Sequence, residues 1–191
     1  MTTCRLMILC LLSLVVASAG AETPAFTAID GKPHQPLDFT ARKATVFIFT
    51  ATDCPIANGY APEINRICEK YAASAAIFLI HADPALKNED ARKHAAEYRY
   101  TCPVLLDPEQ KIVAHAKATI TPEAAVFSSD GKLAYRGRIN DLHVDLGRKR
   151  ASATTHDLRD ALDAVLAGKA VAQPETKAVG CFIPEKKDAK K

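Results

Sequence analysis

Cys54 stands where the sequence predicts that a buried strand turns into a helix. Residues 44–50 form a continuous β-branched and aromatic run typical of a strand in a parallel sheet, and Pro55 suits a first helical turn. At a helix N-terminus, unpaired N–H groups and the helix dipole favour the thiolate, the nucleophilic form of cysteine. We therefore expect Cys54 to be a reactive nucleophile. The carboxylate of Asp53 opposes this charge, and the alternative is that Cys54 is a small apolar residue in a turn.

Two of the other cysteines are expected to lie far from Cys54. Cys68 is 14 residues further along the same predicted helix, which corresponds to about 21 Å along its axis. Cys102 follows the next predicted helix, just before a strand that runs back towards the Cys54 end of the sheet. Because disulfide partners need Cα atoms within roughly 7 Å of each other, we expect neither to reach Cys54. A Cys68–Cys102 disulfide and two buried thiols both remain open.

The remaining candidate partner is Cys181, which follows the last predicted helix in a segment that no predicted element tethers. Gly180 beside it gives the backbone conformational freedom. We expect a mobile tail whose Cys181 resolves Cys54, either in its own chain or in a partner's. The alternative is an incidental or differently paired thiol.

Thr121-Pro122 directly precedes a predicted strand. In this order of strands and helices an X-Pro bond at that place invites the cis form, and it would bring Pro122 close to the helix start that bears Cys54. A trans proline that marks the edge of a strand is the alternative.

The first 21 residues have the pattern of a cleaved secretory signal. Arg5 precedes an apolar run at 6–16, and small residues follow at 17–21. The run is shorter than the ~20 apolar residues of a membrane helix, and an uncleaved anchor is the alternative. We therefore expect an exported protein, periplasmic or secreted, whose four remaining cysteines can form lasting disulfides.

The other patterns predict alternating strands and helices. Apolar, β-branched runs predict a small hairpin and five further strands, at 26–29 with 37–39, 44–50, 75–80, 103–106, 124–128 and 132–136. Helices are expected from 55 with a kink at Pro62, over 84–100 and 109–118, and from 154 or 155 to Gly168. This order predicts an α/β fold with a mixed central β-sheet and helices on both faces.

The length of the chain favours a single domain, and its charge pattern and motifs give no sign of nucleic acid, metal or cofactor binding. Residues 22–167 are enough for one core, and residues 168–191 form a C-terminal tail that carries Cys181. Without Arg5, 24 basic residues face 22 acidic ones, and they are interspersed rather than gathered with aromatic residues as nucleic-acid binding requires. The six histidines show no zinc-site spacing, and no glycine-rich phosphate loop is present.

Three segments and one X-Pro pair carry a family resemblance. They are FIFTATDCPIAN at 47–58, YRGRIND at 135–141, TKAVGC at 176–181 and Thr121-Pro122. Together they resemble the thioredoxin-like superfamily, in particular its redoxin or peroxiredoxin-related branch (alkyl hydroperoxide reductase/thiol-specific antioxidant type) and a bacterial subgroup of exported redoxin-domain proteins. The resemblance covers residues 24 to about 167. It implies a three-layer thioredoxin-like fold and cofactor-free thiol chemistry on protein thiols, disulfides or a hydroperoxide, with an external thiol reductant.

The chain departs from two motifs of these relatives. Ala57 replaces the second cysteine of the thioredoxin C-x-x-C motif, so no local dithiol can form at this turn. Phe47 and Ala51 replace the proline and threonine of the peroxiredoxin motif P-x-x-x-T-x-x-C, and Thr52 is one residue closer to Cys54 than the motif requires. Because that threonine hydroxyl orients peroxide in peroxiredoxins, the departure counts against efficient peroxidase activity.

Pattern and resemblance together suggest five catalytic residues, Cys54, Cys181, Thr52, Pro122 and Arg138. Arg138 is the candidate positive partner of the thiolate, and a solvated arginine on a hairpin is the alternative. The resulting hypothesis is an exported thiol–disulfide oxidoreductase in which Cys54 attacks a disulfide or a peroxide. A thiol peroxidase with antioxidant activity and a non-catalytic docking module are the alternatives, and the oligomeric state stays open.

Overall fold

The computed structural model of the 191-residue chain describes residues 24–186. The predicted signal segment, residues 1–21, lies outside the described residues. Within residues 24–186, no helix combines the length and the apolar character that crossing a membrane requires.

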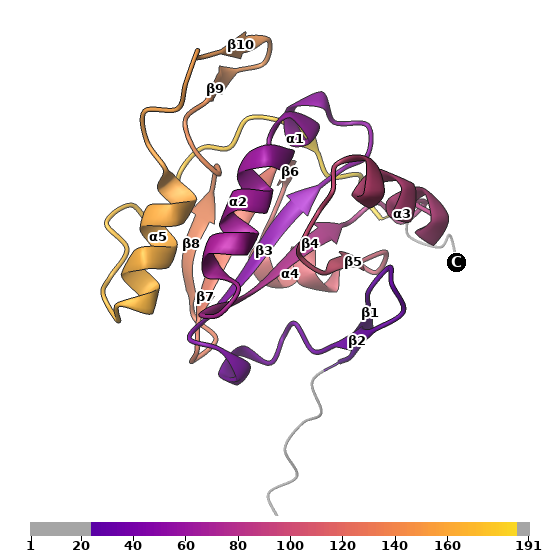
Figure 1. The fold of residues 1–191 in the computed structure, drawn as a ribbon, viewed down its shortest axis with the longest axis horizontal. Helices are drawn as coiled ribbons and strands as arrows, with labels where there is room; N and C mark the ends of the chain where they lie inside the picture. The colour runs from indigo at the N-terminus through magenta and orange to yellow at the C-terminus, as the bar shows by residue number, and fades with distance from the viewer. Residues whose placement is uncertain (1–23, 187–191) are drawn as a thin grey trace, which may run out of the picture.

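A five-stranded sheet forms the centre of the fold, in the order β5-β4-β3-β7-β8 (Figure 1). Its strands are β3 (Ala44–Thr50), β4 (Ala75–His81), β5 (Val104–Leu106), β7 (Glu123–Ser128) and β8 (Leu133–Gly137). β3, β4 and β5 are parallel, β7 runs antiparallel to β3, and β8 runs antiparallel to β7. All seven residues of β3 are buried, as the unbroken apolar pattern predicts for a central strand. The mixed sheet expected from the sequence is confirmed.

Two apolar clusters lie on opposite faces of this sheet. β3 contributes to both, because successive side chains of a strand point to opposite faces. Val46 and Ile48 belong to one cluster, and Phe47 and Phe49 belong to the other. Each face of the sheet therefore has its own core.

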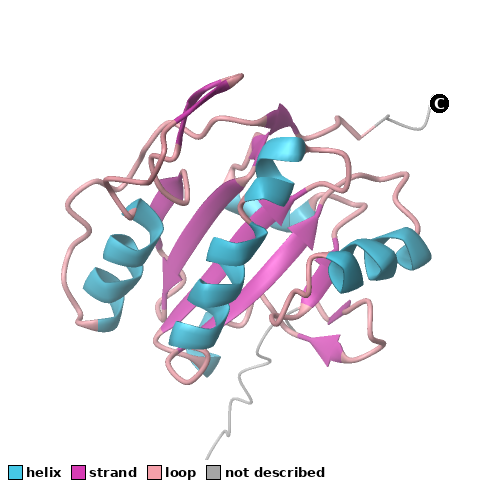
Figure 2. Ribbon diagram, turned by 45° about the horizontal axis from the view of Figure 1, so that its top comes forward, coloured by secondary structure: helices cyan, strands magenta, loops and turns pink. Residues whose placement is uncertain are grey.

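Helices cover both clusters. α2 (Ala61–Tyr71) and α5 (Asp157–Leu166) pack on the first, and Figure 2 shows them side by side over one face of the sheet. α4 (Lys111–Ala116) packs on the second. α3 (Asn88–Glu97) lies near the β5 edge of the sheet (Figure 1). The expected three-layer α/β fold with helices on both faces is confirmed.

The helix predicted after Cys54 is divided in two. α1 (Pro55–Gly59) ends at Tyr60, and α2 begins at Ala61. Pro62 therefore lies in the first turn of α2, where its missing N–H removes no helical hydrogen bond. The kink expected at this proline is instead a break between two helices.

The N-terminal hairpin differs from the expected one. β1 (Phe26–Thr27) pairs with β2 (Pro33–His34) rather than with residues 37–39. The side chain of Asp38 accepts a hydrogen bond from the N–H of Thr40 and caps a short 3-10 helix, η1 (Phe39–Ala41). Because an aspartate with a free carboxylate favours such local turns, the apolar residues on either side of it do not form a strand.

Two helices begin later than expected. α3 begins at Asn88 rather than at 84, and α5 begins at Asp157 rather than at 154 or 155. The backbone N–H groups of Thr154 and Thr155 donate to the carboxylate of Asp141, at 2.6 and 3.0 Å. This long-range contact keeps both threonines out of the helix.

The sequence patterns do not predict two short strand pairs. β9 (His143–Asp145) and β10 (Arg148–Lys149) form a hairpin that projects at the top of Figure 1. β6 (Ile120–Thr121) pairs antiparallel with β11 (Cys181–Phe182), which comes from the predicted C-terminal tail. This second pair builds the site described below.

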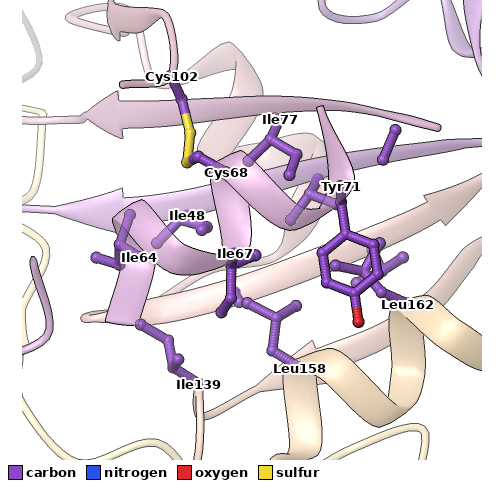
Figure 3. Close-up of a cluster of buried hydrophobic side chains, with 14 of the residues drawn as sticks. Ile48, Ile64, Ile67, Cys68, Tyr71, Ile77, Cys102, Ile139, Leu158 and Leu162 are labelled. Carbon is purple, nitrogen blue, oxygen red and sulfur yellow. A yellow bond between two sulfur atoms is a disulfide. The ribbon is translucent and has the colours of Figure 1, made fainter. Parts of the chain in front are cut away.

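Cys68 and Cys102 form a disulfide, with their Cα atoms 5.8 Å apart. Figure 3 shows that it joins α2 to the segment before β5, beside Ile77 of β4. The bridge lies towards the amino ends of the parallel strands, whereas Cys54 follows the carboxyl end of β3. The expected separation of these two cysteines from Cys54 is therefore confirmed, and of the two open alternatives the disulfide is the one found.

Candidate redox site

Cys54 immediately precedes α1, and backbone groups hold its sulfur on two sides. Cys54 Sγ accepts a hydrogen bond from the N–H of Ala57 at 3.5 Å, as the side chain of a helix N-cap does. The carbonyl oxygen of Thr121 lies 3.2 Å from Sγ and accepts the thiol proton. Cys54 is fully buried, whereas Asp53 is exposed. The opposing carboxylate is therefore in contact with water, which weakens its effect on the sulfur.

The Thr121-Pro122 peptide bond is cis, as the sequence predicts. It connects β6 to β7, and β7 pairs with β3 in the sheet. Because β7 runs antiparallel to β3 and Glu123 pairs with Phe49, the start of β7 lies beside the carboxyl end of β3. The proline turn before β7 and Cys54 after β3 therefore meet at the same end of the sheet. The contact between Thr121 and the Cys54 sulfur is the result.

The segment that carries Cys181 is held along the sheet and is not the untethered tail expected from the sequence. We call residues 174–184 the strap. At its beginning, the N–H of Arg136 in β8 donates to Pro174 O at 2.9 Å, and the N–H of Thr176 donates to Arg136 O at 3.1 Å. The strap thus starts as an addition to the exposed edge of β8, and the tertiary fold supplies the tether that the sequence pattern lacks.

A hydroxyl pair reinforces this first anchor. Thr176 Oγ1 lies 2.6 Å from the hydroxyl of Tyr135 and accepts a hydrogen bond from the N–H of Arg138 at 3.1 Å. Gly137 lies between these two residues, and a Cβ atom there would come within 2.2 Å of Thr176 Oγ1. A residue without a side chain is required for the strap to approach β8 this closely.

The second anchor is the pairing of β11 with β6. Cys181 stands opposite Thr121 in this pair, and the N–H of Ile183 donates to Thr119 O at 3.0 Å. Thr121 also contacts Cys54, so the strand pairing places Cys181 close to Cys54.

Cys54 and Cys181 are the two free cysteines of the described residues, and both are neighbours of Thr121. A hydrogen bond to the Cys54 side chain, followed by partial burial, raises the pKa of the Cys181 thiol to about 11. Cys181 therefore keeps its proton at neutral pH.

Thr52 contributes its backbone to the site rather than its hydroxyl. Thr52 O accepts a hydrogen bond from Asn58 Nδ2 at 3.0 Å, and Asn58 Oδ1 lies 2.9 Å from Nε2 of His94 in α3. Because the Asn58 amide nitrogen is used towards Thr52, its oxygen is the acceptor and His94 Nε2 carries the proton. The turn before Cys54 is thus tied to α3. Within residues 24–186, the Thr52 hydroxyl makes no hydrogen bond to Cys54.

Asn58 and His94 are therefore residues of the site that are not among the five candidates expected from the sequence. Only the position of Asn58, four residues after Cys54, hints at a role. His94 gives no local signal, because it belongs to a polar helical stretch and becomes buried only when α3 packs. That burial lowers the pKa of His94 and keeps the ring neutral.

Arg138 is engaged by α5 rather than by the thiols. Its Nε and Nη2 donate to the two carboxylate oxygens of Asp157, at 2.9 and 3.0 Å. This paired contact raises the pKa of Arg138. No hydrogen bond joins Arg138 to Cys54 or Cys181 among the described residues. The expected role of Arg138 as positive partner of the thiolate is therefore not met in this structure.

A small cleft of about 110 Å³ opens beside Cys181, and its polar lining includes Thr50, Thr52, His81 and Thr121. His81 is almost completely buried, and this burial lowers its pKa to about 3, so the ring is neutral. No cluster of three or more His, Cys, Asp or Glu side chains suited to a metal occurs within residues 24–186.

A family model described as Redoxin matches residues 18–150 of the chain. The chain belongs to the Redoxin family. Membership supports a thiol-redox function, in agreement with the two adjacent thiols, and the relationship to thioredoxin-like redoxins expected from the sequence is confirmed. A search among curated proteins finds no match to this redoxin.

Solved structures similar to this redoxin cover most of its length. An uncharacterized conserved protein from Geobacillus kaustophilus is 27% identical, with a TM-score of 0.74 over 89% of this chain and 93% of that one. A hypothetical protein from Sinorhizobium meliloti 1021 is 24% identical, with a TM-score of 0.73 over 91% and 97%. A secreted Mycobacterium tuberculosis disulfide oxidoreductase homologous to E. coli DsbE is 17% identical, with a TM-score of 0.53 over 76% and 96%. These structures show the thioredoxin-like fold.

The five candidate catalytic residues expected from the sequence thus differ in where they lie in this redoxin. Cys54, Cys181 and Pro122 lie together at one end of the sheet. Thr52 supports the turn through its carbonyl group, and Arg138 is paired with α5. With two free cysteines beside the cis-proline turn, this arrangement can perform thiol–disulfide exchange.

Proposed function

We propose that this redoxin is an exported thiol–disulfide oxidoreductase whose redox-active pair is Cys54 and Cys181. The observation that carries the proposal is that Thr121 is next to both cysteines. Thr121 stands opposite Cys181 in the pairing of β11 with β6, and its carbonyl oxygen lies 3.2 Å from the Cys54 sulfur. Cys181 takes the role of the second cysteine of a C-x-x-C motif, whose position is occupied by Ala57. The two sulfurs are far apart in the sequence and adjacent in the fold.

In the proposed reaction Cys54 acts first and Cys181 second. The Cys54 thiolate attacks one sulfur of a substrate disulfide, and the other substrate sulfur leaves as a thiolate that takes up a proton. A mixed disulfide between Cys54 and the substrate results. Cys181 then loses its proton and attacks the Cys54 sulfur, which releases the second substrate thiolate and forms the Cys54–Cys181 disulfide. Two electrons pass from the dithiol to the substrate, and an external thiol reductant restores the pair.

The buried position of Cys54 sets a condition on the first step. Its sulfur has no exposed surface, and Cys181 and Thr121 cover it. A substrate disulfide therefore reaches Cys54 only after the strap shifts. Such a shift breaks the pairing of Cys181 with Thr121, which includes the hydrogen bond from Thr121 Oγ1 to Cys181 O at 3.4 Å.

Export is supported by the leader pattern and by the cysteine chemistry. The Cys68–Cys102 disulfide is of the kind that persists in oxidising compartments. One protein of the same fold, from Mycobacterium tuberculosis, is described as a secreted disulfide oxidoreductase. A fusion of residues 1–21 to a reporter that folds only outside the cytoplasm tests this part, and an inactive reporter would contradict it.

The dithiol is tested by mapping disulfides in protein isolated without reductant, with free thiols blocked before digestion. The expected result is a Cys54–Cys181 cross-linked peptide that mild reductant removes. The variant Cys181→Ser is expected to accumulate a mixed disulfide with a model disulfide peptide, because nothing resolves it. Cys54→Ser is expected to form none. Free Cys54 and Cys181 in oxidised protein, or full exchange activity in Cys54→Ser, would overturn the proposal.

Disulfide exchange is proposed in preference to peroxide reduction. Neither the Thr52 hydroxyl nor the Arg138 guanidinium makes a hydrogen bond to Cys54 among the described residues. We therefore expect slow consumption of hydroperoxide under conditions in which disulfides are exchanged rapidly. Rapid peroxide consumption with sulfenic acid at Cys54 would favour the peroxidase instead.

A further inference from the structure

The small cleft beside Cys181 lies between one end of the sheet and the strap. One wall is formed by residues 50–53, at the end of β3, and another by residues 81–83, at the end of β4. Thr121 and residues 181–184 of the strap complete the lining, together with Leu86. Because Thr121 and Cys181 also belong to the candidate redox site, a group that enters the cleft lies next to that site.

Hydrogen bonds hold the strap in place at the cleft. Nε2 of Gln110, which directly precedes α4, donates to Ala82 O at 3.1 Å and to Pro184 O at 2.5 Å. Gln110 thus ties the wall after β4 to the far end of the strap. The N–H of Ile183 donates to Thr119 O at 3.0 Å. The cleft is therefore already formed in the free protein, and its occupant does not have to order these walls.

The charged side chains that line the cleft are two carboxylates. They belong to Asp53, which is exposed, and to Asp83, which is half-buried. Among the described residues, no lysine or arginine lines the cleft and neither carboxylate forms a salt bridge. The charge of Asp53 also contributes to the raised pKa of Cys181, so Asp53 lies close to that thiol. The cleft therefore carries negative charge that no side chain of its lining balances.

A buried imidazole adds a polar atom without a partner. His81 lines the cleft and is 1% exposed, and its Nε2 makes no hydrogen bond within residues 24–186. The ring is neutral, and with its proton on Nδ1 it offers Nε2 as a hydrogen-bond acceptor. Because buried polar atoms are rarely left unpaired in folded proteins, this atom points to an occupant of the cleft that donates a hydrogen bond.

The size of the cleft and its apolar rim fit one long side chain. Its volume of about 110 Å³ is well below the roughly 300–1000 Å³ of pockets that hold cofactors or drug-sized ligands. Phe182, which is 83% exposed, also lines it. Lysine and arginine side chains lay their methylene stems along apolar surface and keep the charged group among polar ones. The combination of an exposed ring with two carboxylates suits such a side chain.

We propose that this cleft binds a lysine or arginine side chain of the substrate protein, from a residue close in sequence to the substrate cysteine. The inference rests on the proposed function, because disulfide exchange brings a substrate cysteine to the redox site. The stem of the side chain packs on Phe182, and its cationic group donates hydrogen bonds to the two carboxylates and to His81 Nε2. Since the cleft exists while the strap is in place, this contact forms first and keeps the substrate disulfide at Cys181 until Cys54 is exposed.

The experiment compares three peptides that contain one cysteine, held as a mixed disulfide with thiopyridine. Two positions before and two positions after the cysteine, the peptides carry lysine, glutamine or glutamate. Release of coloured thiopyridine by the reduced full chain gives a second-order rate constant for each peptide. We expect the lysine peptide to react about fivefold faster than the glutamine peptide at low salt, and the glutamate peptide to be the slowest. High salt should reduce these differences.

Two variants separate binding in the cleft from attraction by its charge alone. Asp53→Asn/Asp83→Asn removes both carboxylates and is expected to give equal rates for the lysine and glutamine peptides. Ala51→Phe keeps the charge and narrows the cleft, because Ala51 lines it, and it is expected to remove most of the same preference. The ratio between peptides is compared, since a charge change close to Cys54 alters the absolute rate for every peptide.

The matched control is Glu69→Gln/Asp160→Asn. These two carboxylates, on α2 and α5, are exposed, do not line the cleft and form no salt bridge in the described part of the chain. The control changes the net charge as much as Asp53→Asn/Asp83→Asn does, and it should keep the wild-type ratio between peptides.

Hydroxyethyl disulfide, a small uncharged substrate, distinguishes failure of this inference from failure of the proposed function. If the wild type reacts neither with hydroxyethyl disulfide nor with the peptides, the proposed function fails. If it exchanges hydroxyethyl disulfide and reacts equally fast with all three peptides at low salt, only the cleft inference is overturned. Full preference for lysine in folded Ala51→Phe also overturns it, because the cation is then attracted without entering the cleft.

Discussion

Gly180 lies against the carbonyl group of Thr121, so closely that a Cβ atom at position 180 would come within 1.9 Å of that oxygen. The same Thr121 stands opposite Cys181 in the β6–β11 pair and contacts the Cys54 sulfur. The lack of a side chain at position 180 therefore decides how closely the strap covers Cys54.

Gly180→Ala is expected to push the strap away from Thr121, because the obstacle is backbone that has no room to move. Cys54 then becomes accessible, and its alkylation by iodoacetamide in the reduced protein should be at least about tenfold faster, with a stability loss of about 1–3 kcal/mol. Peptide mapping after timed alkylation measures the rate. Gly59→Ala is the control, since a Cβ atom there meets nothing within 4 Å. Equal Cys54 alkylation in both variants would refute the covering role of the strap.

The Cys68–Cys102 disulfide is expected to stabilise the fold without taking part in exchange. It links residues 34 apart, so Cys68→Ala/Cys102→Ala should lower the free energy of unfolding by about 2–4 kcal/mol. Denaturant unfolding measures this loss. Because the bridge lies at the other end of α2, the rate of disulfide exchange at Cys54 should be the same as in the wild type. A large decrease in exchange in the folded variant would show that the two cysteine pairs are linked.

The Asn58 side chain is expected to couple the Cys54 turn to α3. Asn58→Ala leaves Thr52 O and His94 Nε2 without their partners and should cost about 1–3 kcal/mol of stability. In a double-mutant cycle with His94→Phe, the two losses should be less than additive by at least about 0.5 kcal/mol. Additive losses would mean that the two side chains stabilise the protein independently.

His81 is expected to make the protein less stable in mild acid. Burial lowers the pKa of His81 from its usual 6.5 to about 3. The unfolded chain therefore binds a proton near pH 6.5 that the folded chain refuses until about pH 3, and stability falls as the pH decreases between these values. At pH 5 this contribution has fallen by about 2 kcal/mol relative to pH 8. Unfolding at both pH values, compared with His81→Leu, tests it. An unchanged stability difference between wild type and variant would contradict a neutral buried His81.

Local patterns in the sequence are sufficient to predict the central strand and the two turns next to Cys54. The apolar run 44–50, the turn at Cys54 and the proline at 122 each lie within a few residues of the feature that they specify. A strand buried on both faces, a helix start and a cis X-Pro bond depend on neighbouring residues, so the sequence by itself determines where Cys54 stands and the turn that holds it. The sequence predicted the Cys68–Cys102 disulfide only as one of two alternatives. The length of the predicted helix places both cysteines at the same end of the sheet.

Only the tertiary structure decided what completes the site. The strap has no apolar period of its own, and its position depends on the edge of β8, on the carbonyl group of Thr121 and on two glycines that let backbones approach. Arg138 is likewise assigned to Asp157 by the packing of α5 and not by its own neighbours. Backbone pairing and ion pairing between distant segments leave no periodic trace in either segment. Their partners are therefore set only when the sheet and its helices bring them together.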